Sequence, residues 1–272
     1  MSTTTVHELY FSPTGKTFGV VDLVAQEISH SMNVALKKMN ITLPQSRKRD
    51  LYFSKHDIVI LGFPVYAGKL PNKILPFIKN NIHFHGARVV ALVTFGNRSF
   101  DNALAELTYI VAENGGELMG AAACVVPHVF SATLGEGRPN ASDVADIKDF
   151  AHRTIERIYK EKNLSCADVS GDAEAPYYTP LGIDGAPVMF LKAKPKTYAS
   201  RCVDCKKCAH LCPMAAIDLI CTHEVPGTCI KCQSCVQVCP HGAKYFDDEA
   251  FLSHVAMLEH TYAAPAKNYY YG

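Results

Sequence analysis

The sequence predicts an α/β protein, a doubly wound parallel sheet of five strands followed by a small α+β domain rich in cysteine. Two observations lead to this prediction. Apolar runs of strand length alternate with stretches of helical apolar spacing over residues 1–165. Nine of the eleven cysteines then fall between Cys202 and Cys239, so a cysteine-poor part is followed by a cysteine-dense part.

The elements of the first part follow one another as strand and helix in turn. The run at 88–95, RVVALVTF, is almost wholly apolar, as in a parallel strand covered on both faces. Strands that alternate with helices favour an open parallel sheet with ligands at the carboxyl ends of its strands. The expected strands are 6–11, 34–39, 57–63, 88–95 and 117–126, and the expected helices are 17–31, 72–80, 99–114 and 143–162.

The loop after the first strand, SPTGKT at 12–17, is rich in hydroxyl groups. Its end resembles a nucleotide-binding P-loop, but Tyr10 stands where that motif requires its first glycine. A strand, a hydroxyl-rich turn and a helix N-terminus favour a bound phosphate, because free N–H groups and the helix dipole attract negative charge. An ordinary Ser/Thr cap is the alternative, and this loop alone does not decide between the two.

Two further loops follow expected strands. They are GFPVYAGKLP at 62–71 and TFGNRSFD at 94–101, and each combines glycine with one prominent aromatic residue, Tyr66 or Phe95. Because the carboxyl ends of parallel strands meet at one edge of a sheet, the three loops are expected to converge on one crevice. The first loop offers hydroxyls for a phosphate, and the other two offer aromatic faces and amides for a planar ring.

These three loops make residues 6–162 resemble a flavodoxin. The resemblance implies a sheet of strand order 2-1-3-4-5 and a bound FMN. It implies a phosphate site at Ser12, Thr14, Gly15, Lys16 and Thr17, one side of the ring site at Pro64, Val65, Tyr66, Ala67 and Gly68, and the other side at Thr94, Phe95, Gly96, Asn97 and Arg98.

Two departures from the flavodoxin pattern bear on the ring site. The chain has no tryptophan, so Tyr66 is the expected stacking partner of the ring. Arg98 places a cation where many flavodoxins have acidic or aromatic residues. Near the N1–O2 edge of the ring, that cation would stabilise a reduced, anionic flavin. A solvated loop charge is the alternative reading of Arg98.

The cysteine-dense part contains the same motif twice. CVDCKKCAHLCP begins at Cys202 and CIKCQSCVQVCP begins at Cys229, and both are C-x2-C-x2-C-x3-C-P. This spacing binds iron–sulfur clusters, with the fourth cysteine of each run serving the other cluster. The prediction is therefore one [4Fe-4S] cluster held by Cys202, Cys205, Cys208 and Cys239, and a second held by Cys229, Cys232, Cys235 and Cys212.

Zinc is the rival reading of the paired C-x2-C motifs. Structural zinc usually takes two pairs of ligands for each ion, whereas here two runs of four cysteines each end in Cys-Pro. Residues 200–245 resemble the bacterial two-cluster ferredoxins, and that resemblance favours clusters over zinc. Cys221 lies outside both runs and is expected to have no ligand role.

Four segments are expected along the chain: a flavodoxin-like domain at 1–165, a linker at 166–198, a two-cluster ferredoxin domain at 199–247, and a helix and tail at 248–272. Proline and glycine in the linker favour an extended chain. A helix is expected at 248–260, and the final YAAPAKNYYYG is expected to be a frayed end.

Composition narrows the function classes. The net charge of +1 gives no bulk electrostatic support for binding nucleic acid or a membrane surface. No apolar run has the length of a membrane span, and the N-terminus lacks the regions of a signal peptide, so a cytoplasmic protein is expected. Eleven cysteines in that compartment indicate metal or redox chemistry rather than disulfides.

The whole architecture resembles a flavodoxin–ferredoxin fusion family of anaerobic bacteria and archaea. The resemblance implies an electron-transfer protein with FMN, two [4Fe-4S] clusters and redox protein partners. FMN takes electrons in pairs or singly, each cluster passes one, and tethering the carriers keeps the transfer within one molecule. The alternative is an FMN-dependent reductase of a small molecule, and a redox sensor is a third, weaker reading. No catalytic residue and no oligomeric state is predicted.

Overall fold

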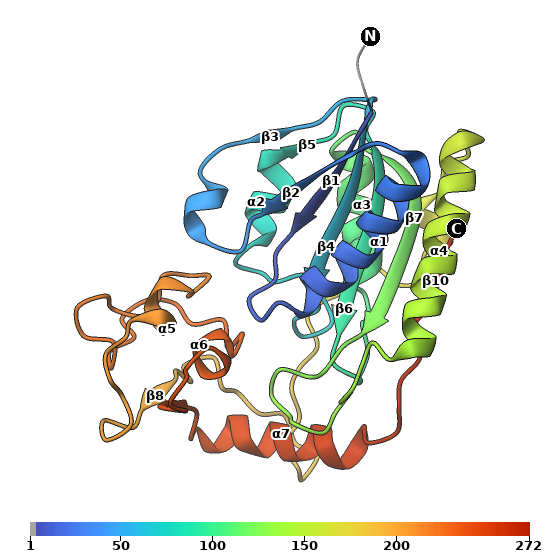
Figure 1. Ribbon diagram of the computed structural model, residues 1–272. Helices are drawn as coiled ribbons and strands as arrows, with labels where there is room; N and C mark the ends of the chain where they lie inside the picture. Colours follow the sequence, from blue (N-terminus) through green and yellow to red (C-terminus); the bar gives the residue numbers. More distant parts are fainter. Residues whose placement is uncertain (1–3) are drawn as a thin grey trace.

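A parallel sheet forms the centre of the computed structural model, which describes residues 4–272 (Figure 1). All five expected strands form, and they pair in parallel in the order β2-β1-β4-β6-β7. Counted along the chain, this is the predicted flavodoxin-like order 2-1-3-4-5. The strands are β1 (Thr5–Tyr10), β2 (Ala35–Asn40), β4 (Asp57–Pro64), β6 (Arg88–Phe95) and β7 (Glu117–Val125).

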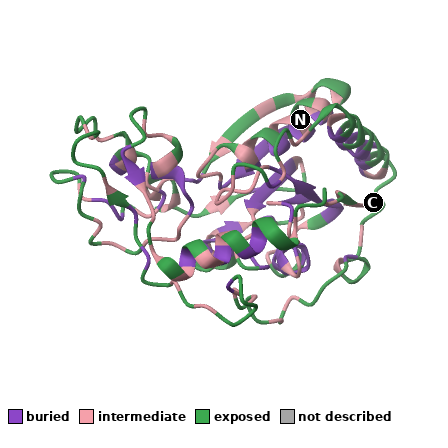
Figure 2. Ribbon diagram, turned by 90° about the horizontal axis from the view of Figure 1, so that it is seen from below, coloured by how far each residue is buried: buried purple, intermediate pink, exposed green. Residues whose placement is uncertain are grey.

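Two pairs of helices cover the two faces of this sheet. α1 (Lys16–Met32) and α4 (Ala141–Tyr159) pack on one face, and α2 (Leu75–Asn81) and α3 (Ala103–Glu113) pack on the other. The apolar strands are therefore buried on both sides, and Figure 2 shows them at the centre of the molecule. Among residues 4–272, no helix is long and apolar enough to cross a membrane.

The sheet has a sixth strand that the sequence did not predict. β10 (Tyr269–Tyr271) pairs antiparallel with β7. Its side chains alternate between the faces, since Tyr270 packs on Phe150 of α4 at 5.5 Å between ring centroids and Tyr269 packs on Phe100 at 5.0 Å. The five predicted strands are therefore joined by one more, and the expectation of a frayed tail is wrong, because the tail pairs with β7 and packs aromatic rings against both faces of the sheet.

Between α4 and β10 the chain leaves the sheet and returns to it. The expected helix at 248–260 forms as α7 (Glu249–Thr261), which runs along the carboxyl-end edge of the sheet beside the cysteine domain (Figure 1). The short elements of this part are η2 (Cys166–Asp168), β8 (Lys196–Thr197), α5 (Lys207–His210), α6 (Ser234–Gln237) and β9 (Lys244–Tyr245). Near α2 lie η1 (Pro44–Arg47), β3 (Leu51–Tyr52) and β5 (Ile82–His83).

One residue of α7 joins three other parts of the chain. The ring of Phe251 contacts Phe130 in the loop after β7, Phe190 in the linker and Phe246 at the end of the cysteine domain, with centroid distances of 4.9, 5.6 and 5.1 Å. This aromatic cluster fastens the cysteine domain to the carboxyl-end side of the sheet.

The segment expected to be a linker lies on the first domain. Lys69 donates through Nζ to the carbonyl oxygen of Ala173 (2.5 Å), and the N–H of Tyr178 donates to the carbonyl oxygen of Ala67 (2.8 Å). The domain boundaries given above remain predictions, but these contacts bind the linker to the turn that follows β4.

A buried carboxyl group sits between β1 and α1. Glu8 is fully buried, and both its carboxyl oxygens have no hydrogen-bond donor among the described groups. Lys38 Nζ is 3.6 Å from Glu8 and 2.5 Å from Asp22. Burial, and then the neighbouring Asp22, raise the pKa of Glu8 to about 7. When Glu8 is protonated, its carboxyl group can donate a hydrogen bond to the Asp22 carboxylate, so the two neighbouring acids do not repel each other.

This pKa predicts a loss of stability with rising pH. The folded state holds the Glu8 proton up to about pH 7, whereas the ordinary pKa is 4.5, so the free energy of unfolding falls as pH rises from 4.5 through 7. Glu8→Gln keeps a neutral donor and should be more stable than the parent at pH 8, by on the order of 2–3 kcal/mol. Thermal unfolding at pH 5.5 and 8 tests this, and an equal pH dependence in both proteins would contradict it.

Candidate redox centres

The loop at 12–17 lies at the carboxyl end of β1 and leads into α1. Ser12 is held at both ends: its N–H donates to Thr42 Oγ1 (2.8 Å), and its Oγ accepts from the N–H of Phe18 (3.0 Å). Gly15, just before α1, has a φ of 78°, and a Cβ built there would meet no heavy atom within 4 Å. The loop is an open turn whose backbone favours glycine.

Several donors of this loop suit an anion. Because α1 begins at Lys16, the N–H groups of Lys16 and Thr17 have no intrahelical acceptor. The hydroxyl of Ser12 accepts a bond but has no acceptor of its own among the described residues. The half-buried Thr14 adds a second hydroxyl, and burial lowers the pKa of Lys16. This donor set fits a phosphate.

Two of the predicted residues lie beneath the loops. Thr17 and Thr94 are each 2% exposed, and their hydroxyl oxygens are 2.7 Å apart. This buried hydrogen bond ties the start of α1 to the end of β6. The structure therefore brings the first and third loops together, with these two hydroxyls bound to each other.

The loop that contains Tyr66 follows Pro64 and Val65 and ends in a sharp turn. Tyr66 and Lys69 exchange backbone hydrogen bonds. The two residues between them have φ of 48° and 76°, and are Ala67 and Gly68. A Cβ at Gly68 would lie 2.3 Å from a carboxylate oxygen of the third loop, so space as well as φ requires glycine here.

Tyr66 is half-buried and lies next to the cysteine domain. Burial raises the pKa of its hydroxyl well above the ordinary value, and the nearby sulfurs of Cys232 and Cys229 raise it further. The expected stacking residue of the ring site is thus also a neighbour of one predicted cluster.

The third loop differs in part from the expected ring site. Phe95 is 3% exposed and packs in the core against Phe100, at 5.6 Å between ring centroids, so it does not present a free ring face. Gly96 makes room for a neighbour, because a Cβ there would lie 2.3 Å from His128 Cδ2. His128 comes from the loop after β7 and received no role from the sequence.

His128 is a neutral imidazole in this position. The N–H of Phe130 donates to its Nδ1 (3.1 Å), so the ring proton lies on Nε2. Burial, together with the charges of His254, Lys16 and Arg98, lowers the pKa of His128 to about 4. A proton-bearing nitrogen therefore lies among residues of the first and third loops.

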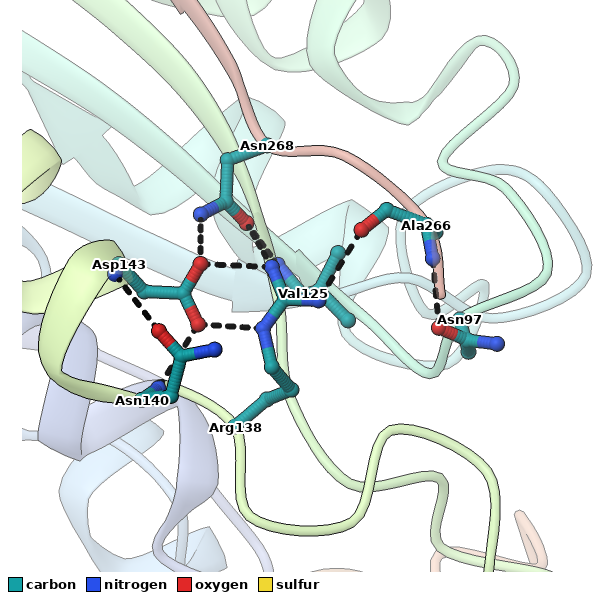
Figure 3. Close-up of polar contacts among 7 residues, drawn as sticks. All are labelled: Asn97, Val125, Arg138, Asn140, Asp143, Ala266 and Asn268. Carbon is teal, nitrogen blue, oxygen red and sulfur yellow. Dashed lines mark hydrogen bonds and ion pairs between the residues drawn. The ribbon is translucent and has the colours of Figure 1, made fainter. Parts of the chain in front are cut away.

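Asn97 binds the C-terminal tail with its whole side chain, and Figure 3 shows one of these contacts, with Ala266. Its Nδ2 donates to the carbonyl oxygens of Tyr262 (2.6 Å) and Ala264 (2.9 Å), and its Oδ1 accepts from the N–H of Ala266 (2.9 Å). The side chain predicted to contact the ring instead fixes the third loop to the tail, which leaves backbone groups of this loop for a ligand.

A second set of contacts, a network of charged and amide side chains, binds the tail closer to its C-terminal end (Figure 3). Arg138 forms an ion pair with Asp143 and donates to the carbonyl oxygen of Ala266 (3.0 Å). Asn268 donates to Asp143 (2.8 Å) and accepts from the N–H of Val125 at the end of β7 (2.8 Å). The tail is therefore held by buried polar groups as well as by β10.

Arg98 is bound to the linker. Its guanidinium lies 4.0 Å from the ring centroid of Tyr178 and forms an ion pair with Asp101. The reading of Arg98 as a solvated loop charge is wrong, because its side chain is only 13% exposed. Its place beside the flavin edge remains a prediction.

The eight cysteines of the two runs surround two hollows. Each hollow is lined by three cysteines of one run and the last cysteine of the other. The inner hollow is lined by Cys212, Cys229, Cys232 and Cys235, and the outer hollow by Cys202, Cys205, Cys208 and Cys239.

The backbone around the hollows repeats every 27 residues, as the cysteines do. Each run, taken with the two residues that follow it, has three left-handed residues, which turn the chain around its hollow. They pair as Asp204 (φ 49°) with Lys231 (54°), Lys206 (60°) with Gln233 (61°), and Ala215 (47°) with Gly242 (56°).

Backbone donors point at the sulfurs that cross between the hollows. The N–H of Ala216 donates to Cys212 Sγ (3.3 Å), and the N–H of Ala243 donates to Cys239 Sγ (3.2 Å). Burial opposes ionisation of Cys239, but hydrogen bonds from the backbone outweigh it and lower the pKa of this thiol. N–H donors of this kind stabilise thiolate ligands of a cluster.

The thiols surround each hollow and do not converge on a point. Within residues 4–272, no three His, Cys, Asp or Glu side chains lie close enough to hold a single metal ion. Four thiols around each hollow fit a group larger than one ion, such as a cluster.

Comparisons with known proteins bear on both parts of the chain. Two families described as 4Fe-4S binding domains match residues 224–245 and 199–215. A search of curated proteins finds no match.

Solved flavodoxins are similar to the first part. A flavodoxin from the domain Archaea has a TM-score of 0.42 at 14% identity, covering 57% of this chain and 99% of the other. Oxidised flavodoxin 2 from Bacillus cereus gives 0.38 at 17%, covering 57% and 99%. Rubredoxin oxygen:oxidoreductase from the anaerobe Desulfovibrio gigas gives 0.41 at 18%, covering 58% and 36%.

The sheet order 2-1-3-4-5 and the matches to 4Fe-4S binding domains together decide the architecture. The chain is a fusion of a flavodoxin-like domain and a ferredoxin domain. In this fusion the inner hollow faces the flavodoxin-like domain. Met214 and Ile230 line that hollow and also pack against the core of the flavodoxin-like domain. The outer hollow faces solvent, since Cys205 is exposed and Val203 is 61% exposed.

Sequence reasoning on this fusion missed the residues that join its domains. His128 and Tyr178 contact the predicted flavin loops from other segments, and Arg47 contacts the ferredoxin domain. None of them stands in a motif. The one available signal was the position of His128 directly after the fifth expected strand, where a ligand-binding loop was to be expected.

Proposed function

We propose that this protein transfers electrons between FMN and two [4Fe-4S] clusters, and so links one-electron and two-electron redox partners in anaerobic, cytoplasmic metabolism. The observation that carries the proposal is the inner hollow, lined by four cysteines, which lies beside Tyr66 of the predicted flavin site. Two kinds of redox centre within one chain and next to each other favour intramolecular transfer.

The residues present fit both groups. The first loop would hold the FMN phosphate with the N–H groups of α1 and the hydroxyls of Ser12 and Thr14, and Tyr66 would lie against the ring. Bound FMN would supply a centre that accepts electrons singly or in pairs. Cys212, Cys229, Cys232 and Cys235 would hold the inner cluster, and Cys202, Cys205, Cys208 and Cys239 the outer one.

The positions of the hollows suggest an order of transfer. Cys205 and Val203 expose the outer hollow, so redox protein partners would reach the chain there. The inner hollow lies between the outer hollow and the flavin loops. The linker and the tail bind the second and third of these loops, through Tyr178 and Asn97. Electrons would therefore reach the flavin by way of the clusters.

One observation favours a second function, the reduction of a small molecule at FMN. Such a reduction usually needs protons as well as electrons, and His128 holds a proton on Nε2 among the predicted flavin loops. The reductase would be favoured if directly reduced flavin turned over one metabolite in a saturable way. This turnover should survive loss of the clusters and should be lost in His128→Phe.

The composition of the purified protein tests the main proposal. Anaerobic preparations should contain about eight iron atoms and matching acid-labile sulfide per chain, together with one FMN. A redox titration should then resolve the flavin from the clusters. Stoichiometric zinc without sulfide would refute the cluster assignment.

The phosphate site predicts a loss of FMN affinity on removal of two hydroxyls. Ser12→Ala with Thr14→Ala should weaken FMN binding by a few kcal/mol, because hydrogen bonds to charged groups are worth about 1.5–3 kcal/mol each. Thr17→Ala should act through the buried bond to Thr94 and lower stability as well. Exposed Ser46→Ala is the matched control, and fluorescence titration of the apoprotein with FMN and with riboflavin is the measurement. An unchanged affinity for FMN would place the phosphate elsewhere.

A further inference from the structure

Arg47, the last residue of η1, joins the two domains through its guanidinium. Its Nη1 donates to the carbonyl oxygens of Ile41 and Thr42, both at 2.6 Å. Its Nη2 donates to the carbonyl oxygen of Pro213, also at 2.6 Å. The same group lies over the ring of Phe11 at the end of β1, 5.7 Å from the centroid. One side chain therefore binds the flavodoxin-like domain with one arm and the ferredoxin domain with the other.

On each side, a residue bound by Arg47 is directly bonded to a residue of a predicted redox site, by a hydrogen bond on one side and by a peptide bond on the other. On the flavodoxin-like side, the hydroxyl of Thr42 accepts from the N–H of Ser12, the first residue of the phosphate loop. On the ferredoxin side, Pro213 directly follows Cys212, and both residues line the inner hollow. A shift of Arg47 would therefore move the phosphate loop relative to the inner hollow.

The chemistry of the bridge requires arginine. Three carbonyl oxygens in different directions need the planar fork of a guanidinium, and a lysine ammonium is a compact, strongly hydrated charge without that fixed geometry. Arg47 is also half-buried, and this burial lowers the pKa of its guanidinium. A cation placed beside a ligand of the inner hollow favours a cluster that has gained an electron.

We propose that Arg47 is a positioning residue that sets the spacing between the phosphate loop and the inner cluster, and thereby the rate of electron transfer between that cluster and FMN. This inference rests on the proposed function. In each transfer the inner cluster would be oxidised by one electron and the flavin would be reduced by one. Because tunnelling falls steeply with distance, a small change of spacing changes the rate.

Two variants separate geometry from charge. Arg47→Lys keeps the charge and loses the fork, whereas Arg47→Met loses both. Arg49→Met removes an exposed arginine two residues away and is the matched control. Measurements on the full, anaerobically prepared chain are iron and FMN content, the potential of each cluster, the rate of flavin reduction after rapid photoreduction of the clusters, and hydrogen exchange of the amides at 212–216.

Both Arg47 variants should retain iron and FMN. Their rate of flavin reduction should be lower than that of the parent by roughly tenfold or more, because small changes in the placement of the reacting groups strongly change such a rate. Amides at 212–216 should exchange faster in both. The potential of the inner cluster should fall in Arg47→Met and stay near that of the parent in Arg47→Lys. Arg49→Met should match the parent throughout.

Parent-like rates of flavin reduction in both Arg47 variants would overturn this inference while leaving the proposed function intact. Loss of iron or FMN from Arg47→Lys would also overturn it, because Arg47 would then act on stability alone. A parent protein that binds both groups but transfers no electron between them would instead refute the proposed function.

Discussion

Replacing Cys232 with alanine is expected to stop electrons from reaching the flavin while FMN stays bound. Cys232 is buried in the inner hollow, whereas Cys205 is exposed in the outer one. Each substitution should remove one [4Fe-4S] cluster and lower iron from about eight to about four atoms per chain. In Cys232→Ala the outer cluster should still be reduced by a low-potential donor, because it faces solvent.

Cys205→Ala and Cys232→Ala should differ in whether a cluster remains next to the flavin. Cys205→Ala keeps the inner cluster beside the flavin, so slow flavin reduction should persist, while Cys232→Ala should show almost none. Exposed Cys221, outside both runs, gives the matched control Cys221→Ala with full iron and full rates. The measurements are iron content, the electron paramagnetic resonance spectrum of the reduced cluster and the time course of flavin absorbance. Equal flavin reduction in both ligand variants would contradict the proposed order of centres.

The second large effect is expected at a buried ion pair. Lys69 and Glu106 are 3.2 Å apart, with side chains 5% and 6% exposed. Lys69 also donates to Ala173 of the linker, and the N–H of Leu70 donates to Glu106. Lys69→Ala should lower the free energy of unfolding by about 3–5 kcal/mol, because it leaves a buried carboxylate without its cation.

Matched variants separate the charge from the side-chain volume. Lys69→Met with Glu106→Gln removes both charges and should recover most of the lost stability. Lys73→Ala, an exposed lysine nearby, should change little. Urea unfolding gives the free energies, and limited proteolysis should cut Lys69→Ala near 173–178, where the linker loses its anchor. A Lys69→Ala protein as stable as Lys73→Ala would show that the pair contributes nothing.

Local patterns in the sequence predicted most of the fold. The apolar runs that became β4 and β6 have no polar face, so their burial follows from composition alone. The fixed spacing of the two cysteine runs likewise predicted which thiols share a hollow, and the structure groups them in the same way. In both cases the information lies within a short stretch of chain.

What the sequence could not predict depends on contacts between distant residues. The side chain of Asn97 meets the backbone of Ala266, and no pattern near Asn97 indicates that the tail returns to it. The YYY of β10 is too short to be recognised as a strand without the open edge of β7. Phe95 looked like a ring-binding residue because it ends a strand, but Phe100 five residues later draws it into the core.

Because of β10, the flavodoxin-like domain is made of two segments of the chain that are separated in sequence by the ferredoxin domain. The last strand of the flavodoxin-like sheet is made by residues that follow the ferredoxin domain, so the ferredoxin domain is topologically an insertion and not an appendage. Residues 1–165 expressed alone would leave the edge of β7 with unpaired N–H and C=O groups, which invite pairing with another chain. During synthesis, the cysteine runs emerge before the strand that completes the sheet. Cluster insertion and completion of the flavodoxin-like domain are therefore expected to be coupled steps in the maturation of one molecule.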